Sequence, residues 1–171
     1  MNALRKSIAV FALLGMLALM LGCTGLSSDK DSLSQLAALE NKYGVKDSFS
    51  PNAETMNDYI SSLSLLRGKS GGSAAKVLDA ELYSAEAFYY LNNALAGSAM
   101  IDFQKMGCSS KEVRGAISSI SLAENYYNKA IPAINALSGD EKNYLRQNQL
   151  ETIQAYGSKI NQIKAFFAQK C

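Results

Sequence analysis

Cysteine is the residue type in this sequence best suited to covalent chemistry, because the side chains that usually carry catalysis are scarce. The chain has three cysteines, Cys23, Cys108 and Cys171, and no histidine. Di-iron helical bundles, haem attachment and hydrolytic triads normally depend on histidine, so these sites are excluded. Cys108 and Cys171 lack a Cys-x-x-Cys context, which argues against a redox-active pair. We expect no catalytic residue, no cofactor and no metal site.

Glu124 is the carboxylate whose surroundings in the sequence stand out. It lies on one heptad row with Ile117 and Ile131, at the margin of an apolar stripe, whereas others, such as Asp79, fall on polar rows. A partly buried carboxylate there could bind a cation or a ligand amine, or serve a carboxylate-based enzyme. The preferred interpretation is that Glu124 reaches water or pairs with a lysine such as Lys164.

The tyrosines offer a second kind of binding surface. Two adjacent pairs, Tyr89-Tyr90 and Tyr126-Tyr127, point about 100° apart on a helix, so one member of each pair can be buried while the other is presented. Core packing is the default expectation. The alternative is a groove lined by Tyr89, Glu124 and Tyr127 that binds a small molecule or a peptide.

The first 22 residues have the layout of an export signal. Basic residues, Arg5 and Lys6, precede an apolar run over residues 8–21, which is short for a membrane span of about 20 apolar residues. Met20-Leu21-Gly22-Cys23 resembles the lipobox of prokaryotic membrane lipoproteins, with Met20 where that family more often has Leu. The resemblance implies cleavage before Cys23, a lipid on its sulfur, and anchoring to the outer face of a prokaryotic membrane.

Other interpretations of this region are a plain secretory signal or an uncleaved anchor, with Cys23 an ordinary thiol. The polar run over residues 24–32 favours lipidation, because it suits a tether that holds a folded body off a membrane.

The charge of the mature chain argues against nucleic acid as a partner. Removal of residues 1–22 takes away Arg5 and Lys6, so the 17 basic residues fall to 15 and equal the 15 acidic residues. A neutral chain without a Lys/Arg cluster has little attraction for phosphate backbones or anionic headgroups. The lipid on Cys23, rather than basic charge, would then hold the protein to the membrane.

The composition predicts an all-α fold. Helix formers dominate, the chain has two prolines, and no region alternates β-branched residues with a period of two. We expect an antiparallel up-down-up bundle of three long helices preceded by two short helices. The expected divisions are a signal peptide (1–22), a tether (23–31), two short helices with a Gly/Ser linker (32–72) and the bundle domain (73–171).

Capping residues predict where these helices begin and end. The first short helix is expected over residues 32–42, before Gly44. The second is expected to use Ser50 as its N-cap and Pro51 as its first residue, and to end at Gly68.

The long helices are expected from apolar periodicity, at about residues 74–106, 109–137 and 139–169. Ser109 with Glu112, and Ser138 with Glu141, each fit the capping box that starts a helix. Pro132 predicts a bend within the middle helix, which could curve the bundle around a groove.

The lengths of the last two helices predict a disulfide. At about 1.5 Å per residue the chain travels out and back by nearly equal distances, which returns Cys171 to the end where Cys108 lies. If Cys23 carries lipid, the other two cysteines remain as a pair in an oxidising compartment. The alternative is two free thiols.

Part of the bundle also has a weak likeness to a repeat family. Ala85-Glu86-x-Phe88-Tyr89 and Ala123-Glu124-x-Tyr126-Tyr127 correspond at a spacing of 38, and residues 126–137 are similar to helices of tetratricopeptide-like repeats. The resemblance, over about a dozen residues per copy, implies helical hairpins and peptide binding.

We therefore expect a lipid-anchored, extracytoplasmic helical bundle that acts in the cell envelope as a non-catalytic interaction or scaffold module. Its expected partners are the membrane, through the lipid on Cys23, and an envelope protein or peptide. The alternative is a binding protein with a Tyr-lined groove, and the least favoured interpretation is a carboxylate-based enzyme.

Overall fold

The computed structural model describes residues 28–50, 52–95 and 107–171 of the 171-residue chain. Four predictions lie outside these ranges: the signal peptide, the lipidated Cys23, the helical role of Pro51, and the end of the first long helix beyond Leu95. Within the described ranges the protein is helical, with no β-strand.

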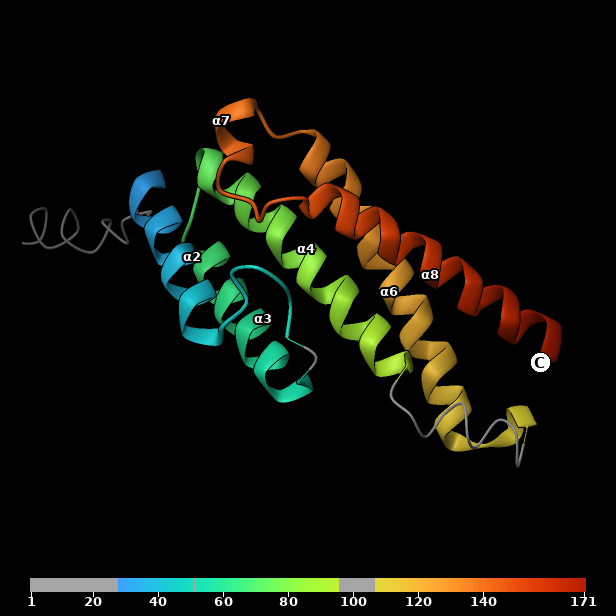
Figure 1. The fold of residues 1–171 in the computed structure, drawn as a ribbon. Coiled ribbons are helices and arrows are strands. Elements are labelled where there is room, and N and C mark those ends of the chain that lie inside the picture. Colours follow the sequence, from blue (N-terminus) through green and yellow to red (C-terminus); the bar gives the residue numbers. More distant parts are fainter. Residues whose placement is uncertain (1–27, 51, 96–106) are drawn as a thin grey trace, which may run out of the picture.

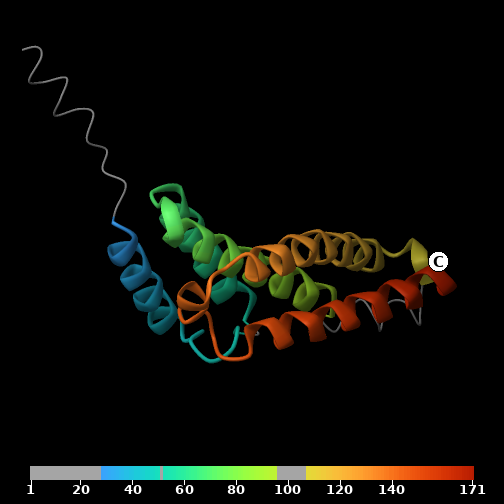
Figure 2. The ribbon, with the colours of Figure 1, turned by 90° about the horizontal axis from the view of Figure 1, so that it is seen from above.

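The helices form the predicted up-down-up bundle (Figure 1). Helices α4, α6 and α8 run in alternating directions, and α2 and α3 pack beside the first half of α4 (Figures 1 and 2). The all-α fold class is therefore confirmed. In chain order the helices are α2 (Asp29–Tyr43), α3 (Ala53–Gly68), α4 (Gly72–Leu95), the 3-10 turn η1 (Gly107–Ser109), α6 (Lys111–Asn135), α7 (Gly139–Lys142) and α8 (Gln149–Lys170).

Helix α2 starts earlier than predicted. The side chain of Ser28 caps it by accepting a hydrogen bond from the backbone N–H of Asp31, so residues 29–31 of the expected tether are helical. The helix ends as predicted at Gly44, whose φ of 64° places it in the left-handed region that glycine adopts without strain.

The N-caps of α3 and α6 both differ from the prediction. Asn52, not Ser50, caps α3, because its Oδ1 accepts from the N–H of Thr55 at 2.9 Å. Ser110, not Ser109, caps α6 by accepting from the N–H of Val113 at 3.1 Å. Turn η1 takes up residues 107–109, so α6 begins one residue later than a Ser109 cap would allow.

The third long helix is interrupted, which the periodicity did not predict. The Ser138–Glu141 capping box is present and starts α7, and the Ser138 N–H bond holds the pKa of Glu141 at about 2. Helix α7 then ends at Lys142, and residues 143–148 form turns before α8. Asn148, with a φ of 60°, precedes the first residue of α8.

One core joins the two short helices to the bundle. Its buried side chains come from α2, α3, α4, α6 and α8, and include Leu36, Met56, Leu78, Ile134 and Ile153. Residues 32–67 therefore pack on the bundle. Two smaller clusters continue the core toward the disulfide end, around Ile120 and Ile160 and around Val113 and Phe167.

Across residues 28–50, 52–95 and 107–171, no helix has the length and apolar character needed to span a membrane.

Candidate functional site

A buried ion pair lies where α3, α4 and the α7–α8 connection meet. Glu81 of α4 is fully buried, and its Oε2 accepts from Nη2 of Arg146 at 2.8 Å while Oε1 accepts from Nη1. The hydroxyl of Tyr59, from α3, donates to the same Oε1 at 2.7 Å. Both oxygens of the Glu81 carboxylate are therefore occupied by partners from distant parts of the chain.

The helical period explains why Glu81 is buried. Its neighbours one turn away on each side are Val77, Leu78, Ser84 and Ala85, and all four are buried. The apolar and small residues at these spacings were a signal in the sequence that singles out Glu81 rather than Glu124.

Arg146 is held in the core by several further contacts. Its guanidinium carbon lies 3.8 Å from the centre of the Phe49 ring. The side chain of Gln149 accepts from the Arg146 backbone N–H at 3.1 Å and donates to Ser84 Oγ at 3.0 Å. These bonds fold residues 143–148 onto α4, which interrupts the helix that the sequence predicts there.

The pKa shifts within this group follow from burial and charge. Burial and the Glu81 carboxylate raise the pKa of Tyr59, which therefore keeps its proton as a donor. Burial lowers the pKa of Arg146, but the combined effects of Glu81, Tyr59 and Glu40 outweigh it, so the net shift is upward and the guanidinium stays charged. The arrangement holds a fixed charge pair and offers no free nucleophile or base.

Glu40 of α2 is the buried carboxylate beside this pair. It is 9% exposed, and its Oε1 has no hydrogen-bond partner in the part of the chain that the structure describes. Burial, with repulsion from Glu81, raises the pKa of Glu40 to about 7, against smaller opposing effects of Arg146 and Lys46.

Glu40 lines a cleft of about 340 Å³, which we call the Glu40 cleft. The cleft lies between α2, the connection from α2 to α3, and the connection from α7 to α8. Its walls are formed by Leu33, Leu36, Ala37, Glu40, Lys46, Asp47, Asn143, Tyr144, Leu145, Arg146 and Gln147. A buried carboxylate with one unpartnered oxygen, in a cleft of mixed apolar and polar walls, can pair with a cationic group.

The residues predicted to line a Tyr groove have separate partners. Glu124 forms an ion pair with Lys164 at 2.5 Å, which is the preferred interpretation given above. The ring of Tyr127 packs over the backbone of Gly157. Tyr89 packs edge-on against Tyr90, with the ring centroids 5.2 Å apart.

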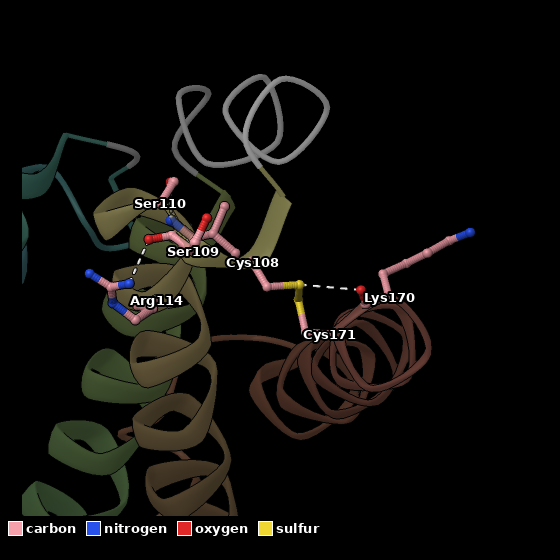
Figure 3. Close-up of a disulfide and its surroundings, with 7 residues drawn as sticks. Cys108, Ser109, Ser110, Arg114, Lys170 and Cys171 are labelled. Atoms are coloured by element: carbon pink, nitrogen blue, oxygen red, sulfur yellow. Dashed lines mark hydrogen bonds between the residues drawn. A yellow bond between two sulfur atoms is a disulfide. The ribbon is translucent and has the colours of Figure 1, made fainter.

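The predicted disulfide is present at the end of the bundle far from α2 (Figures 1 and 3). It joins Cys108 of η1 to Cys171, across 63 positions, with the Cα atoms 5.5 Å apart. The Cys108 sulfur also lies 3.2 Å from the carbonyl oxygen of Lys170 (Figure 3). Helix α6 and the α7–α8 segment have similar lengths and run in opposite directions, which brings the two residues together.

Among residues 28–50, 52–95 and 107–171, no group of three or more Asp, Glu, Cys or His side chains is arranged to hold a metal ion. Comparisons with family models, with curated proteins and with solved structures gave no match to this chain.

Proposed function

We propose that the protein is an exported lipoprotein, anchored through Cys23 to the outer face of a prokaryotic membrane, whose helical body is a non-catalytic interaction module of the cell envelope. The observation that carries the proposal is the Cys108–Cys171 disulfide. Stable disulfides are typical of oxidising compartments, and this one leaves Cys23 as the cysteine outside the bridge. The lipobox-like residues before Cys23 supply the route to that compartment.

The early start of α2 supports anchoring close to the surface. Asp29 follows Cys23 by six positions, a stretch that spans at most about 22 Å. The first turn of α2 lies at the end of the molecule opposite Cys171 (Figures 1 and 2). The α2 end would therefore face the membrane, and the disulfide end would point away from it.

Binding is favoured over catalysis because the buried charged and polar side chains at the centre of the fold already form hydrogen bonds with one another. Arg146 and Tyr59 both donate hydrogen bonds to Glu81, and Gln149 donates to Ser84. A second candidate function, a binding protein for a small molecule or peptide, is favoured by the Glu40 cleft rather than by a Tyr groove.

Intact mass analysis of the protein purified from membranes tests the anchor. We expect the native chain to lack residues 1–22, to carry acyl groups on Cys23, and to gain two alkylatable thiols only on reduction. Cys23→Ser should abolish acylation, whereas the double variant Cys108→Ser with Cys171→Ser should keep it. A native chain that retains Met1, bears no acyl group and has three free thiols would contradict the proposal.

Crosslinking in intact membranes tests the interaction role. We expect crosslinks to a defined envelope protein or peptide. A specific substrate turnover that is abolished by changing one polar side chain would show instead that the body is an enzyme.

A further inference from the structure

We propose that the Glu40 cleft binds a primary alkylammonium group, with the Glu40 carboxylate as its counter-ion and the aliphatic side of the cleft around its methylene stem. The assignment rests on the proposed role of the body as an interaction module, but it does not depend on the lipid anchor.

The first support is an unbalanced charge. Two carboxylates, Glu40 and Glu81, act on the guanidinium of Arg146. Both oxygens of Glu81 accept hydrogen bonds from Arg146. Lys46 at the rim of the cleft and Arg146 both attract the Glu40 carboxylate, but burial and the charge of Glu81 outweigh them. With every group ionised, the carboxylates of Glu40, Glu81 and Asp47 exceed the cations Arg146 and Lys46 by one negative charge.

The second support is the burial of that charge. Glu40 is 9% exposed and its Oε1 has no hydrogen-bond partner among the described residues. A buried carboxylate with an unpartnered oxygen is costly to ionise, so it takes up either a proton or a cation. The hydroxyl of Tyr59 is not a hydrogen-bond donor to Glu40, because it donates to Glu81.

The shape of the cleft selects the kind of cation. One wall is made by Leu33, Leu36 and Ala37 of α2, on the same helix as Glu40. Aliphatic side chains next to a carboxylate suit an ammonium on a methylene stem, because the stem is shielded from water while the head is paired. A metal ion fits poorly, since no cluster of three metal-ligating side chains lies here or elsewhere in the described ranges.

Ionisation of Glu40 gives the complex a distinct pH signature. Because its pKa is about 7, roughly half of the free protein holds a proton on this carboxyl at pH 7. An alkylammonium pairs only with the ionised form, so binding releases that proton. The ionised fraction, and with it the apparent affinity, rises about tenfold between pH 6 and pH 8.

The test is calorimetric titration of the full chain in a neutral detergent, in buffers of different ionisation enthalpy. The probes are cadaverine, the peptide acetyl-Gly-Lys-Gly-amide, and the same peptide with norleucine in place of lysine as the uncharged control. We expect binding of a charged probe, about tenfold tighter at pH 8 than at pH 6, with proton release at pH 7. The norleucine peptide should not bind.

Three variants locate the site. Glu40→Gln should weaken binding at least tenfold and remove the pH dependence, whereas Glu54→Gln, at an exposed carboxylate of α3, should leave both unchanged. Ala37→Lys places an ammonium at an exposed position on the cleft wall and should block the probes without disturbing the core. Far-ultraviolet circular dichroism checks that each variant is folded.

The outcomes separate two sources of the ligand. Binding of cadaverine alone supports a free amine, binding of the lysine peptide alone supports a lysine side chain of a protein partner, and binding of both supports the shared chemistry. Failure of both charged probes at pH 8, equal binding to Glu40→Gln, or binding of the norleucine peptide would overturn the assignment. Acylation measured on the same sample tests the anchor independently.

Discussion

The guanidinium of Arg146 forms two hydrogen bonds with the carboxylate of Glu81, which lies 65 positions earlier in the chain. The Nη2–Oε2 distance is 2.8 Å, and 6% of the Arg146 side chain and 1% of the Glu81 side chain are exposed. The pair ties α4 to the segment between α7 and α8. It thereby fixes where the chain leaves one helix and enters the next.

Replacing Glu81 with Gln should destabilise the protein strongly. The substitution keeps the size of the side chain but leaves the buried guanidinium of Arg146 without its counter-charge, a change that costs about 3–5 kcal/mol in other proteins. Urea unfolding at pH 7 measures the loss.

Glu124→Gln is the matched control for that experiment. It breaks the ion pair with Lys164, whose side chains are 33% and 43% exposed, and exposed pairs contribute up to about 1 kcal/mol. Equal losses for the two variants would show that the Glu81 pair has no special role in the core.

Glu40 should make the protein less stable as the pH rises. Its pKa is about 7 in the folded state and near 4.5 in the unfolded chain. Between these values the folded state holds a proton that the unfolded state has released, so the contribution of Glu40 is full below pH 4.5 and is lost as the pH passes 7. The size of this loss is roughly 3 kcal/mol.

Comparison of wild type with Glu40→Gln isolates this effect. In urea unfolding, the free energy of unfolding should fall less between pH 5 and pH 8 for the variant than for wild type, because glutamine cannot ionise at this position. The assigned origin is wrong if both proteins lose the same free energy of unfolding.

Gly157 should resist substitution because of Tyr127. A Cβ atom at residue 157 would lie 2.5 Å from Cζ of the Tyr127 ring, whereas a Cβ at Gly115 meets nothing within 4 Å. We expect Gly157→Ala to destabilise the protein by about 1 kcal/mol or more, through crowding. Gly115→Ala should stabilise it by about 0.5–1 kcal/mol, as in other helix interiors.

A double-variant cycle checks the cause. In a Tyr127→Ala background the crowding is gone, so Gly157→Ala should be neutral or stabilising. A persistent loss of thermal stability in that background would place the cause elsewhere.

The disulfide should contribute substantially to stability. It closes a loop of 63 positions, for which the chain-entropy treatment gives roughly 4 kcal/mol. The double variant Cys108→Ser with Cys171→Ser should lose about this much in urea unfolding, and wild type under reducing conditions should match it. A difference of less than 1 kcal/mol between oxidised and reduced wild type would contradict the expectation.

The helices could be predicted because their signals are local. In α6 the large side chains Val113, Ile120, Tyr127 and Ile134 recur every seven residues, which is typical of one buried helix face, and all of them except the half-buried Tyr127 are buried. The helix starts were less well predicted where two neighbouring polar residues could each serve as the N-cap. Ser109 and Ser110 are both able to cap α6, and turn η1 decides between them.

The candidate site was predicted only in part. The pairing of Cys108 with Cys171 followed from helix lengths, which a sequence provides. The Glu40 cleft was missed, because Glu40 is buried only when α2 packs on α3 and α4, and the sequence does not show that packing. Glu81 carried a signal in its buried neighbours at helical spacing, but its partner Arg146 carried none.

The sequence by itself determined the helical class, the buried stripe of α6, and the meeting of the two distal cysteines, because these depend on periodicity and length. The tertiary structure decided which charges are buried together and where the last helical segment breaks. A helical period is read from residues three or four positions apart, whereas the stability of a buried charge depends on a partner that folding brings from 65 positions away.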